Sequence, residues 1–356
     1  MDFKGTEQRR MNILIVKLSA IGDVLHTLPS LAALRKLYPD AHITWVVEEA
    51  AADLVKNHPF LDRVLISRRK SWIDDFSRLK IRQPWREIRS FLKELRLRPY
   101  DLVIDFHGLL KSSLIVLLSG AKRKLGYDSL QELSGLFLNE KIPEDMNKHA
   151  VDRYLDFPRY LGAKTGKVEF ILPLNREKEA AARELQKKYN LEDKKYIAVN
   201  PVAFWETKLW DNEKFAQMAD LIAEKFNIKV VFTGSEKEPL EKIISQMSSK
   251  ALNLGGETSL IDLAYLYRQA LMVITTDSGP MHLAAAMGSP VIALFGPTDP
   301  ARTGPYGAGH TIIRADLPCS PCFSKKCSTK KCMEDIAVEK VWAAVNSQMH
   351  LQTRQN

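Results

Sequence analysis

The 356-residue chain has no uninterrupted apolar run of the roughly 20 residues that a membrane-spanning helix needs. Its longest apolar stretches, such as 114–118 and 291–295, suit buried strands or helix segments. We therefore do not expect the chain to span a membrane. Residues 1–10 are polar and lack the apolar core of a secretory leader, so we expect a frayed tail there and no export.

Cysteine is scarce and confined to one segment. The four cysteines are Cys319, Cys322, Cys327 and Cys332, whereas the disulfide framework of a secreted protein is usually dispersed along a small chain. A reducing compartment is favoured, and the cytoplasm is the expected location. Four thiols suffice for a tetrahedral zinc site, but this spacing is not that of a standard finger pair, and reduced free cysteines explain the cluster without metal. We expect no metal, with a structural site as the alternative.

Signatures of nucleic-acid binding are also missing, because the sequence has no zinc-finger, helix-turn-helix or aromatic RNA-binding motif. The net charge of +9 nevertheless favours anionic ligands and weak, salt-dependent binding to anionic bilayer surfaces. Acidic lipid headgroups and phosphorylated sugars are therefore better candidate partners than nucleic acid.

What the chain does contain is a repeated alternation of apolar strands and helices, typical of parallel sheets covered by helices. In the first half we expect strands at 13–17, 43–47, 64–66 and 102–105, helices near 24–37 and 111–118, and a basic, tryptophan-bearing insertion at 68–86. In the second half we expect strands at 196–200, 229–233, 273–276 and 291–295, and helices near 215–226, from 280 and at 338–349.

This repetition predicts an α/β protein with two Rossmann-like domains that face a central cleft. The expected boundaries are 11–170 for an acceptor-binding domain and 171–335 for a donor-binding domain, followed by a C-terminal helix at 336–356 that packs back on the first domain. Ligands of such sheets bind at the carboxyl ends of the strands. Function should therefore be sought in the loops that follow the strands.

The first such loop, 17–23, contains the small residues Ser19 and Gly22 and ends in Asp23 at a predicted helix entrance. Asp is favoured there as a cap and is stabilised by the helix dipole, so capping alone would explain it. The two roles are compatible, because an ionised carboxylate remains available to accept a proton, although as a weak base.

The segment 275–282 has the pattern of a strand, a tight turn and a helix start. Ser278 and Gly279 would expose backbone N–H groups, and Pro280 suits the first turn, an arrangement that binds phosphate. A capped helix without ligand is the plain alternative, and a lone His282 is more often a buried, satisfied histidine than a catalyst.

Charged residues follow other strands of both halves. Lys208 follows the first strand of the second half and could neutralise a leaving phosphate, and Glu238 follows the next strand, where an acidic residue could hold ribose hydroxyls. Each of the two is equally typical of a solvated surface residue. In the first half, an anionic acceptor would suit a set of basic residues, although a charge run is also a common exposed loop: Arg68, Arg69, Lys70, His107 and Lys111.

Taken together, several motifs resemble the ADP-heptose lipopolysaccharide heptosyltransferases, with the closest likeness to the heptosyltransferase I branch. These motifs are 13–17 with 21–29 (IGDVLHTLP), 45–49 (WVVEE), 105–112, 208–210, 277–282 and 296–300. The resemblance implies a GT-B fold, ADP-heptose as donor, a Kdo-bearing lipid A as acceptor at the inner face of the cytoplasmic membrane, and no cofactor.

The resemblance also implies roles for residues that match these motifs. Asp23 would be the general base of an inverting transfer and Lys208 the phosphate partner, with Glu238 a ribose contact. The remaining donor-binding positions would be Ser19, Gly22, Thr207, Asp277, Ser278, Gly279, Pro280, Met281 and His282.

Alternatives of other kinds remain open. Ala203 and Phe204 stand where the first branch carries threonines, and the cysteine-rich segment resembles the heptosyltransferase II branch, so a second-branch enzyme or another core-sugar transferase is the near alternative. A Rossmann oxidoreductase is disfavoured, because the first loop lacks a G-x-G-x-x-G turn. A non-enzymatic protein that binds nucleotide sugars or lipid-linked glycans would bind donor without releasing ADP.

Overall fold

The computed structural model describes residues 10–129 and 135–353, so the tail predicted at 1–10 lies outside it except for Arg10. The chain divides into two compact units. Unit 1 comprises Met1–Met146 and Ala150–Pro173, and unit 2 comprises Asn147–His149 and Leu174–Asn356. Within the described ranges, no helix combines the length and the apolarity of a membrane span.

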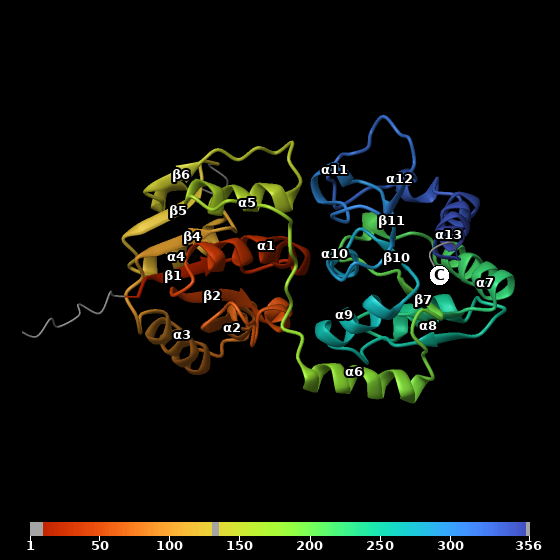
Figure 1. The fold of residues 1–356 in the computed structure, drawn as a ribbon, viewed down its shortest axis with the longest axis horizontal. Helices are drawn as coiled ribbons and strands as arrows, with labels where there is room; N and C mark the ends of the chain where they lie inside the picture. Colours follow the sequence, from red (N-terminus) through yellow and green to blue (C-terminus); the bar gives the residue numbers. More distant parts are fainter. Residues whose placement is uncertain (1–9, 130–134, 354–356) are drawn as a thin grey trace, which may run out of the picture. The chain divides into compact units, whose positions relative to one another are not determined.

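Unit 1 is built on a parallel sheet of six strands in the order β3-β2-β1-β4-β5-β6. The strands are β1 (Asn12–Val16), β2 (His42–Glu48), β3 (Arg63–Ser67), β4 (Leu102–Asp105), β5 (Arg123–Tyr127) and β6 (Glu140–Ile142). Its helices are α1 (Ile21–Leu37), the 3-10 helix η1 (Glu49–Leu54), α2 (Arg69–Ser77), α3 (Arg82–Leu95), α4 (Leu110–Leu118) and α5 (Ala150–Tyr160). Helices α1 and α5 lie side by side over the sheet (Figure 1).

The basic region at 68–86, for which no secondary structure was predicted, is largely helical. It forms α2 and the first turn of α3. Trp72 is buried and packs edge-on against Phe91 of α3, with the ring centroids 5.8 Å apart. The tryptophan thus joins two helices through apolar contact, which a count of charges along this region does not indicate.

Unit 2 repeats the strand order of unit 1. Its parallel sheet has the order β12-β11-β10-β7-β8-β9. The strands are β7 (Tyr196–Asn200), β8 (Lys229–Phe232), β9 (Ala251–Asn253), β10 (Val273–Thr276), β11 (Val291–Phe295) and β12 (Thr311–Arg314). The helices are α6 (Arg176–Tyr189), η3 (Glu206–Lys208), α7 (Asn212–Phe226), α8 (Glu238–Ile244), α9 (Leu260–Gln269), α10 (Gly279–Ala286), α11 (Pro300–Thr303), α12 (Lys331–Glu334) and α13 (Val338–Thr353).

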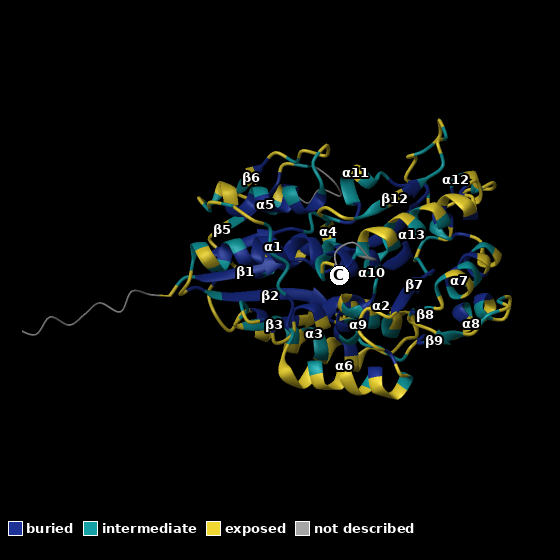
Figure 2. Cartoon of the chain, turned by 45° about the vertical axis from the view of Figure 1, so that its right-hand side comes forward, coloured by how far each residue is buried: buried dark blue, intermediate teal, exposed yellow. Residues whose placement is uncertain are grey.

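The central strands are buried on both faces because helices cover each sheet. All five residues of β1, β7 and β11 are buried, and apart from one terminal asparagine each in β1 and β7 the strands are apolar throughout rather than alternating. Figure 2 shows β1 and β2 as buried, in contrast to the largely exposed outer helix α6. The apolar core of unit 2 also includes Val341 and Val345 of α13, which packs on α7. The predicted return of this helix to the first half stays a prediction.

Each sheet reverses its strand order once, between β1 and β4 in unit 1 and between β7 and β10 in unit 2. Ligands of open α/β sheets bind at such a reversal, because the loops after the two strands diverge there and leave a crevice. The residues that follow these four strands are therefore the first place to look for a site.

Candidate functional site

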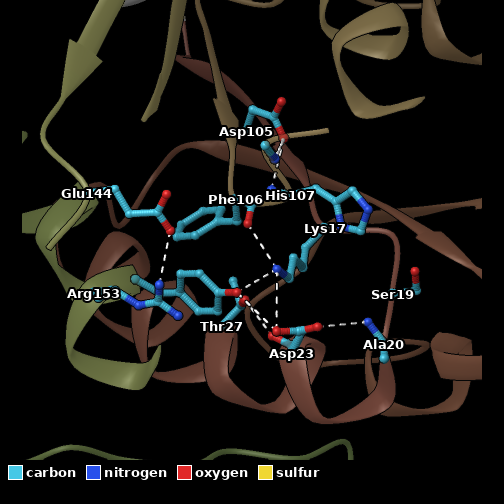
Figure 3. A network of polar contacts seen from close by, with 12 residues as sticks. Lys17, Ser19, Ala20, Asp23, Thr27, Asp105, Phe106, His107, Glu144 and Arg153 are labelled. Carbon is cyan, nitrogen blue, oxygen red and sulfur yellow. Dashed lines mark hydrogen bonds and ion pairs between the residues drawn. The ribbon is translucent and has the colours of Figure 1, made fainter. Parts of the chain in front are cut away.

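The reversal point of unit 1 holds a lysine, a tyrosine and an aspartate in contact (Figure 3). Lys17, at the end of β1, donates from Nζ to the Tyr154 hydroxyl at 2.6 Å and to the carbonyl oxygen of Phe106 at 3.0 Å. Tyr154, from α5, donates its hydroxyl to Asp23 Oδ1 at 3.1 Å. Asp23 Oδ2 accepts the Ala20 N–H at 3.1 Å. Asp23 is therefore not the N-cap, which is Ala20, but the third residue of α1, from where its side chain caps the N-cap N–H. Each of its oxygens retains a lone pair.

The electrostatics of this cluster keep Asp23 ionised. Burial works to raise the pKa of Asp23, but the Lys17 ammonium, the Ala20 N–H and the Tyr154 hydroxyl together hold it below its ordinary value. Lys17 lies 3.8 Å from Asp23 Oδ1, and burial lowers the lysine pKa. The Asp23 side chain is 42% exposed while that of Lys17 is 4% exposed. The carboxylate therefore combines a fixed position with access from outside.

The second strand at this reversal, β4, contributes Asp105 and His107. Buried Asp105 accepts the N–H groups of His107 and Gly108 and the hydroxyl of Ser112, which fixes the loop. Both ring nitrogens of His107 are buried and have no hydrogen-bond partner among the residues that the structure describes. Burial and the Lys17 and Lys111 charges lower its pKa to about 3, so the imidazole is neutral. Such a ring can offer a donor or an acceptor to a ligand.

The basic residues predicted to bind an acceptor gather around a carboxylate that the sequence analysis did not assign to the site. Glu48, at the end of β2, is only 3% exposed. Its Oε1 lies 3.2 Å from Arg69 Nε and 3.5 Å from Lys111 Nζ, and its Oε2 lies 3.9 Å from Lys70 Nζ. Three cations thus share one buried carboxylate, which leaves an excess of positive charge beside the strand ends.

Lys111 and Arg68, both predicted to bind the acceptor, differ in their contacts beside Glu48. Lys111 also donates to the Ser19 hydroxyl at 3.0 Å, which links the loop after β1 to α4. Arg68 turns to other partners, because it pairs with Glu49 at 2.9 Å and Glu87 at 3.1 Å. Arg68 therefore lies beside the group formed by Arg69, Lys70 and Lys111 rather than on Glu48.

The reversal point of unit 2 holds a second lysine–aspartate pair. Lys208 Nζ, in the loop after β7, lies 2.5 Å from Asp277 Oδ2, which directly follows β10. The same oxygen accepts the Thr298 hydroxyl at 2.5 Å. The Asp277 side chain is 4% exposed and that of Lys208 14% exposed. The Lys208 ammonium also lies 4.6 Å from the centre of the Trp205 ring, which further confines it.

Asp277 leads directly into α10, whose N-cap is Ser278 and whose first residues are Gly279 and Pro280. The Ser278 hydroxyl makes no capping bond and is buried without a hydrogen-bond partner among the described residues. A buried hydroxyl normally finds a partner, because an unpaired one costs about 1–3 kcal/mol. This vacant hydrogen-bonding capacity at a helix start is consistent with an anionic ligand.

The remaining residues predicted to bind the donor are either buried or paired with neighbours in their own unit. Thr207 is buried and donates its hydroxyl to the carbonyl oxygen of Ser324 at 2.9 Å. The Met281 side chain is wholly buried and His282 is 9% exposed. Glu238 is exposed in the first turn of α8 and pairs with Lys242 at 2.8 Å. In unit 1, Gly22 is buried within α1.

The four cysteines lie close enough to influence one another. Burial raises the pKa of Cys332, and the neighbouring cysteines raise it further. Cys319, Cys322 and Cys327 are exposed, and hydrogen bonds from backbone N–H groups lower the pKa of Cys327. In the part of the chain that the structure describes, no three or more His, Cys, Asp or Glu side chains are arranged to hold a metal ion.

Four residues of these clusters escaped the sequence analysis as site residues. Lys17 carries a usable signal, because it is a charge that directly follows the four apolar residues 13–16 of β1. Glu48 has a similar signal at the end of β2. Thr298 lies in a loop rich in small residues, and Tyr154 has no signal at all, since it meets Asp23 from 131 positions away.

Two Rossmann-like units of the same strand order make this an α/β protein of the GT-B fold found in glycosyltransferases. The solved structure of Escherichia coli heptosyltransferase WaaC with ADP aligns with a TM-score of 0.77 and 26% identity, over 95% of this chain and all of that one. Residues 88–333 match the model of glycosyltransferase family 9 (heptosyltransferase). The chain belongs to this family.

Curated relatives come from both branches of the family. Lipopolysaccharide heptosyltransferase 1 of Pseudomonas aeruginosa is 30% identical over 337 residues, which cover 91% of this chain and 90% of that protein. Lipooligosaccharide heptosyltransferase 2 of Campylobacter jejuni is 27% identical over 93% of this chain and 96% of its own length. The chain is thus a glycosyltransferase of the heptosyltransferase family with relatives in both of its branches.

Proposed function

We propose that this enzyme transfers a heptose from ADP-heptose to a Kdo residue of lipid A during synthesis of the lipopolysaccharide inner core. The observation that carries the proposal is the exposed Asp23 carboxylate, held ionised by Lys17 and Tyr154 at the sheet reversal of unit 1. The names of the relatives support the sugar and the pathway, and the ADP in the solved relative supports the donor.

In this proposal Asp23 removes the proton from an acceptor hydroxyl as the oxygen attacks the anomeric carbon, which is inverted. Because the carboxylate is already ionised at neutral pH, it is ready to accept the proton, and general base catalysis of this kind contributes about 10²–10⁴-fold. The excess cations Arg69, Lys70 and Lys111 attract the acidic groups of the acceptor. Neutral His107 offers a hydrogen bond at the same edge.

The donor diphosphate binds unit 2, beside Lys208 and the start of α10. Lys208 then shares its charge between Asp277 and the departing ADP, and the Ser278 hydroxyl gains the partner that it lacks. Charge placed in advance against the leaving group lowers the barrier by about 3 kcal/mol for each good donor. Transfer proceeds without a metal ion or cofactor, since these cations supply the positive charge. The enzyme works at the inner face of the cytoplasmic membrane as a peripheral protein.

A release assay tests the proposed reaction. The purified protein is mixed with ADP-heptose and either Kdo-lipid A or the same acceptor already carrying one heptose, and free ADP and glycan mass are measured. We expect ADP release and a heptose-sized mass increase with Kdo-lipid A. Donor binding without ADP release on either acceptor would instead identify a binding protein.

The second candidate is the heptosyltransferase II reaction, in which the acceptor already carries a heptose. The relative from C. jejuni favours it, and so does the cysteine-rich segment at 319–332, which resembles that branch. Turnover on the heptose-bearing acceptor alone would assign the chain to this branch. Turnover with another nucleotide sugar and none with ADP-heptose would assign it to a different core sugar.

A further inference from the structure

The loop between α2 and α3 exposes large apolar side chains. Leu79 is 86% exposed, and Ile81 and Trp85 are 56% and 55% exposed. Scattered single exposures of this kind are normal, but three within seven residues at one tip of a unit need an explanation. Leu79 and Ile81 precede α3, and Trp85 lies in its first turns.

Arginines surround these side chains on one face of α3. Arg82, Arg86 and Arg89 recur with the three- and four-residue spacing of a helix face, and they line an open surface hollow with Ile81 and Trp85. The docking patch is defined as Leu79, Ile81, Arg82, Trp85, Arg86 and Arg89.

The opposite face of α3 already packs within unit 1. Phe91 and Leu92 contact the apolar core that includes Leu95, and Phe91 meets Trp72. The Trp85 ring rests edge-on against Phe76, with the centroids 6.3 Å apart. One side of α3 therefore packs in the core of unit 1, and the docking patch lies on the other side. The contact between Trp85 and Phe76 holds the patch in place.

The charges of the docking patch are available to a partner. Residues 78–89 contain five Arg or Lys residues and a single acidic one, Glu87. Glu87 is occupied by Arg68 and by the Trp72 indole N–H. Within residues 10–129 and 135–353, no hydrogen bond or ion pair engages Arg82, Arg86 or Arg89. The patch thus presents unneutralised positive charge beside exposed apolar groups.

We propose that the docking patch binds the surface of an anionic bilayer, with the arginines at the headgroups and Leu79, Ile81 and Trp85 inserted among them. A basic helix face with tryptophan and aliphatic residues suits this boundary, because apolar burial and attraction to acidic lipids add. Nucleic acid binds chiefly through its phosphates and would leave Leu79 and Ile81 unused. The inference rests on the proposed function only in that a lipid-linked acceptor lies at such a surface.

Flotation of the full chain with vesicles tests the proposal directly. One set of vesicles is phosphatidylcholine alone, and the other contains one-third phosphatidylglycerol. We expect binding to the acidic vesicles only, and a decrease as salt rises. The triple variant R82Q/R86Q/R89Q should bind about a hundredfold more weakly, since each basic residue near such a surface contributes roughly fivefold. The triple variant L79S/I81S/W85S should bind at least a hundredfold more weakly, because three large apolar side chains no longer leave water.

The matched control removes the same charge from an exposed helix of unit 2. The variant R183Q/K187Q/K188Q alters α6 and should bind acidic vesicles within threefold of the unaltered chain. An equal loss of vesicle binding in R82Q/R86Q/R89Q and in R183Q/K187Q/K188Q would show that binding depends on net charge alone. That result would overturn the proposal for the docking patch. Binding to neutral vesicles as strong as to acidic ones would overturn it as well.

A second readout separates lipid from other polyanions. Tryptophan fluorescence of the unaltered chain and of W85F is measured with vesicles whose lipids carry bromine near the headgroup. We expect the bromine to quench the emission of Trp85, so quenching should be larger in the unaltered chain than in W85F. Equal affinity for a single-stranded oligonucleotide, with no such quenching, would overturn the assignment to lipid. ADP release from detergent-dispersed acceptor should be unchanged in R82Q/R86Q/R89Q, so loss of vesicle binding and failure of the proposed reaction are distinguishable.

Discussion

The two units place a lysine–aspartate pair at the same point of the same topology, yet the pairs differ in how much of the carboxylate is free. In unit 1 the Lys17–Asp23 separation is 3.8 Å and the aspartate is 42% exposed. In unit 2 the Lys208–Asp277 separation is 2.5 Å and the aspartate is 4% exposed. The difference teaches that a shared fold fixes where charge is gathered, whereas local burial decides whether a carboxylate can react or only orient its partner.

The largest expected effect comes from exchanging the two aspartates for asparagine one at a time. Asp23→Asn should lower kcat by about 10³-fold and leave ADP affinity unchanged, because an amide cannot take the proton. Asp277→Asn should chiefly weaken ADP binding, since Lys208 loses the group that orients it. Single-turnover kinetics and calorimetric ADP titration measure both. If Asp23→Asn keeps most of its turnover, the general-base role of Asp23 is wrong.

The next effect concerns Lys208. Lys208→Met should slow transfer about a hundredfold and also destabilise unit 2 by about 3 kcal/mol, because buried Asp277 is left without its counter-charge. The double variant Lys208→Met with Asp277→Asn should recover much of the melting temperature but not the rate. Recovery of both would mean that Lys208 acts only through the stability of the unit.

A smaller effect is expected at Tyr154, which orients Asp23. Tyr154→Phe removes a hydrogen bond that lowers the Asp23 pKa, so this pKa should rise and the acid limb of the kcat/KM profile should move to higher pH. At neutral pH we expect a loss of about tenfold or less. Tyr127→Phe is the matched control, because the Tyr127 hydroxyl is buried without a hydrogen-bond partner in the described structure. Its profile should not move.

The smallest effect is on stability and involves His107. Its folded pKa of about 3 lies below the ordinary 6.5, so the unfolded chain binds the proton first as pH falls. The free energy of unfolding should therefore decrease between pH 6.5 and 5, by about 1 kcal/mol once partial exposure is allowed for. His107→Asn should flatten this slope, and an unchanged slope in that variant would rule out His107 as its source. Thermal melts at both pH values test this.

Much of the fold was predictable because buried parallel strands are short apolar runs with clear ends. The predicted strands at 102–105, 196–200, 273–276 and 291–295 are confirmed to the residue. The helices within 68–86 were not predicted, because that region was assessed by its charges, and the contact of Trp72 with Phe91 joins α2 to α3 only in the folded chain. Edge strands such as β6 and β9 are three residues long and carry too little signal.

The positions of the candidate site residues in the fold were predictable where a charge follows a strand and not where a contact depends on distant packing. Asp23, Lys208 and Asp277 lie at reversal points that the strand order creates. Tyr154 reaches Asp23 only because α5 packs along α1, and no pattern near residue 154 indicates that contact. Whether Thr207 and Glu238 face a ligand or a neighbour likewise depends on tertiary contacts, and both have neighbours within unit 2.

The seclusion of Lys17 has a practical consequence for chemical labelling. Its amine donates to Tyr154 and Phe106 and the side chain is only 4% exposed, although burial leaves it easier to deprotonate than a surface lysine. An acylating reagent should therefore modify the surface amines first and reach Lys17 only when α5 moves away from α1. The extent of acylation at this one residue, read by mass spectrometry, would report how often the first unit opens.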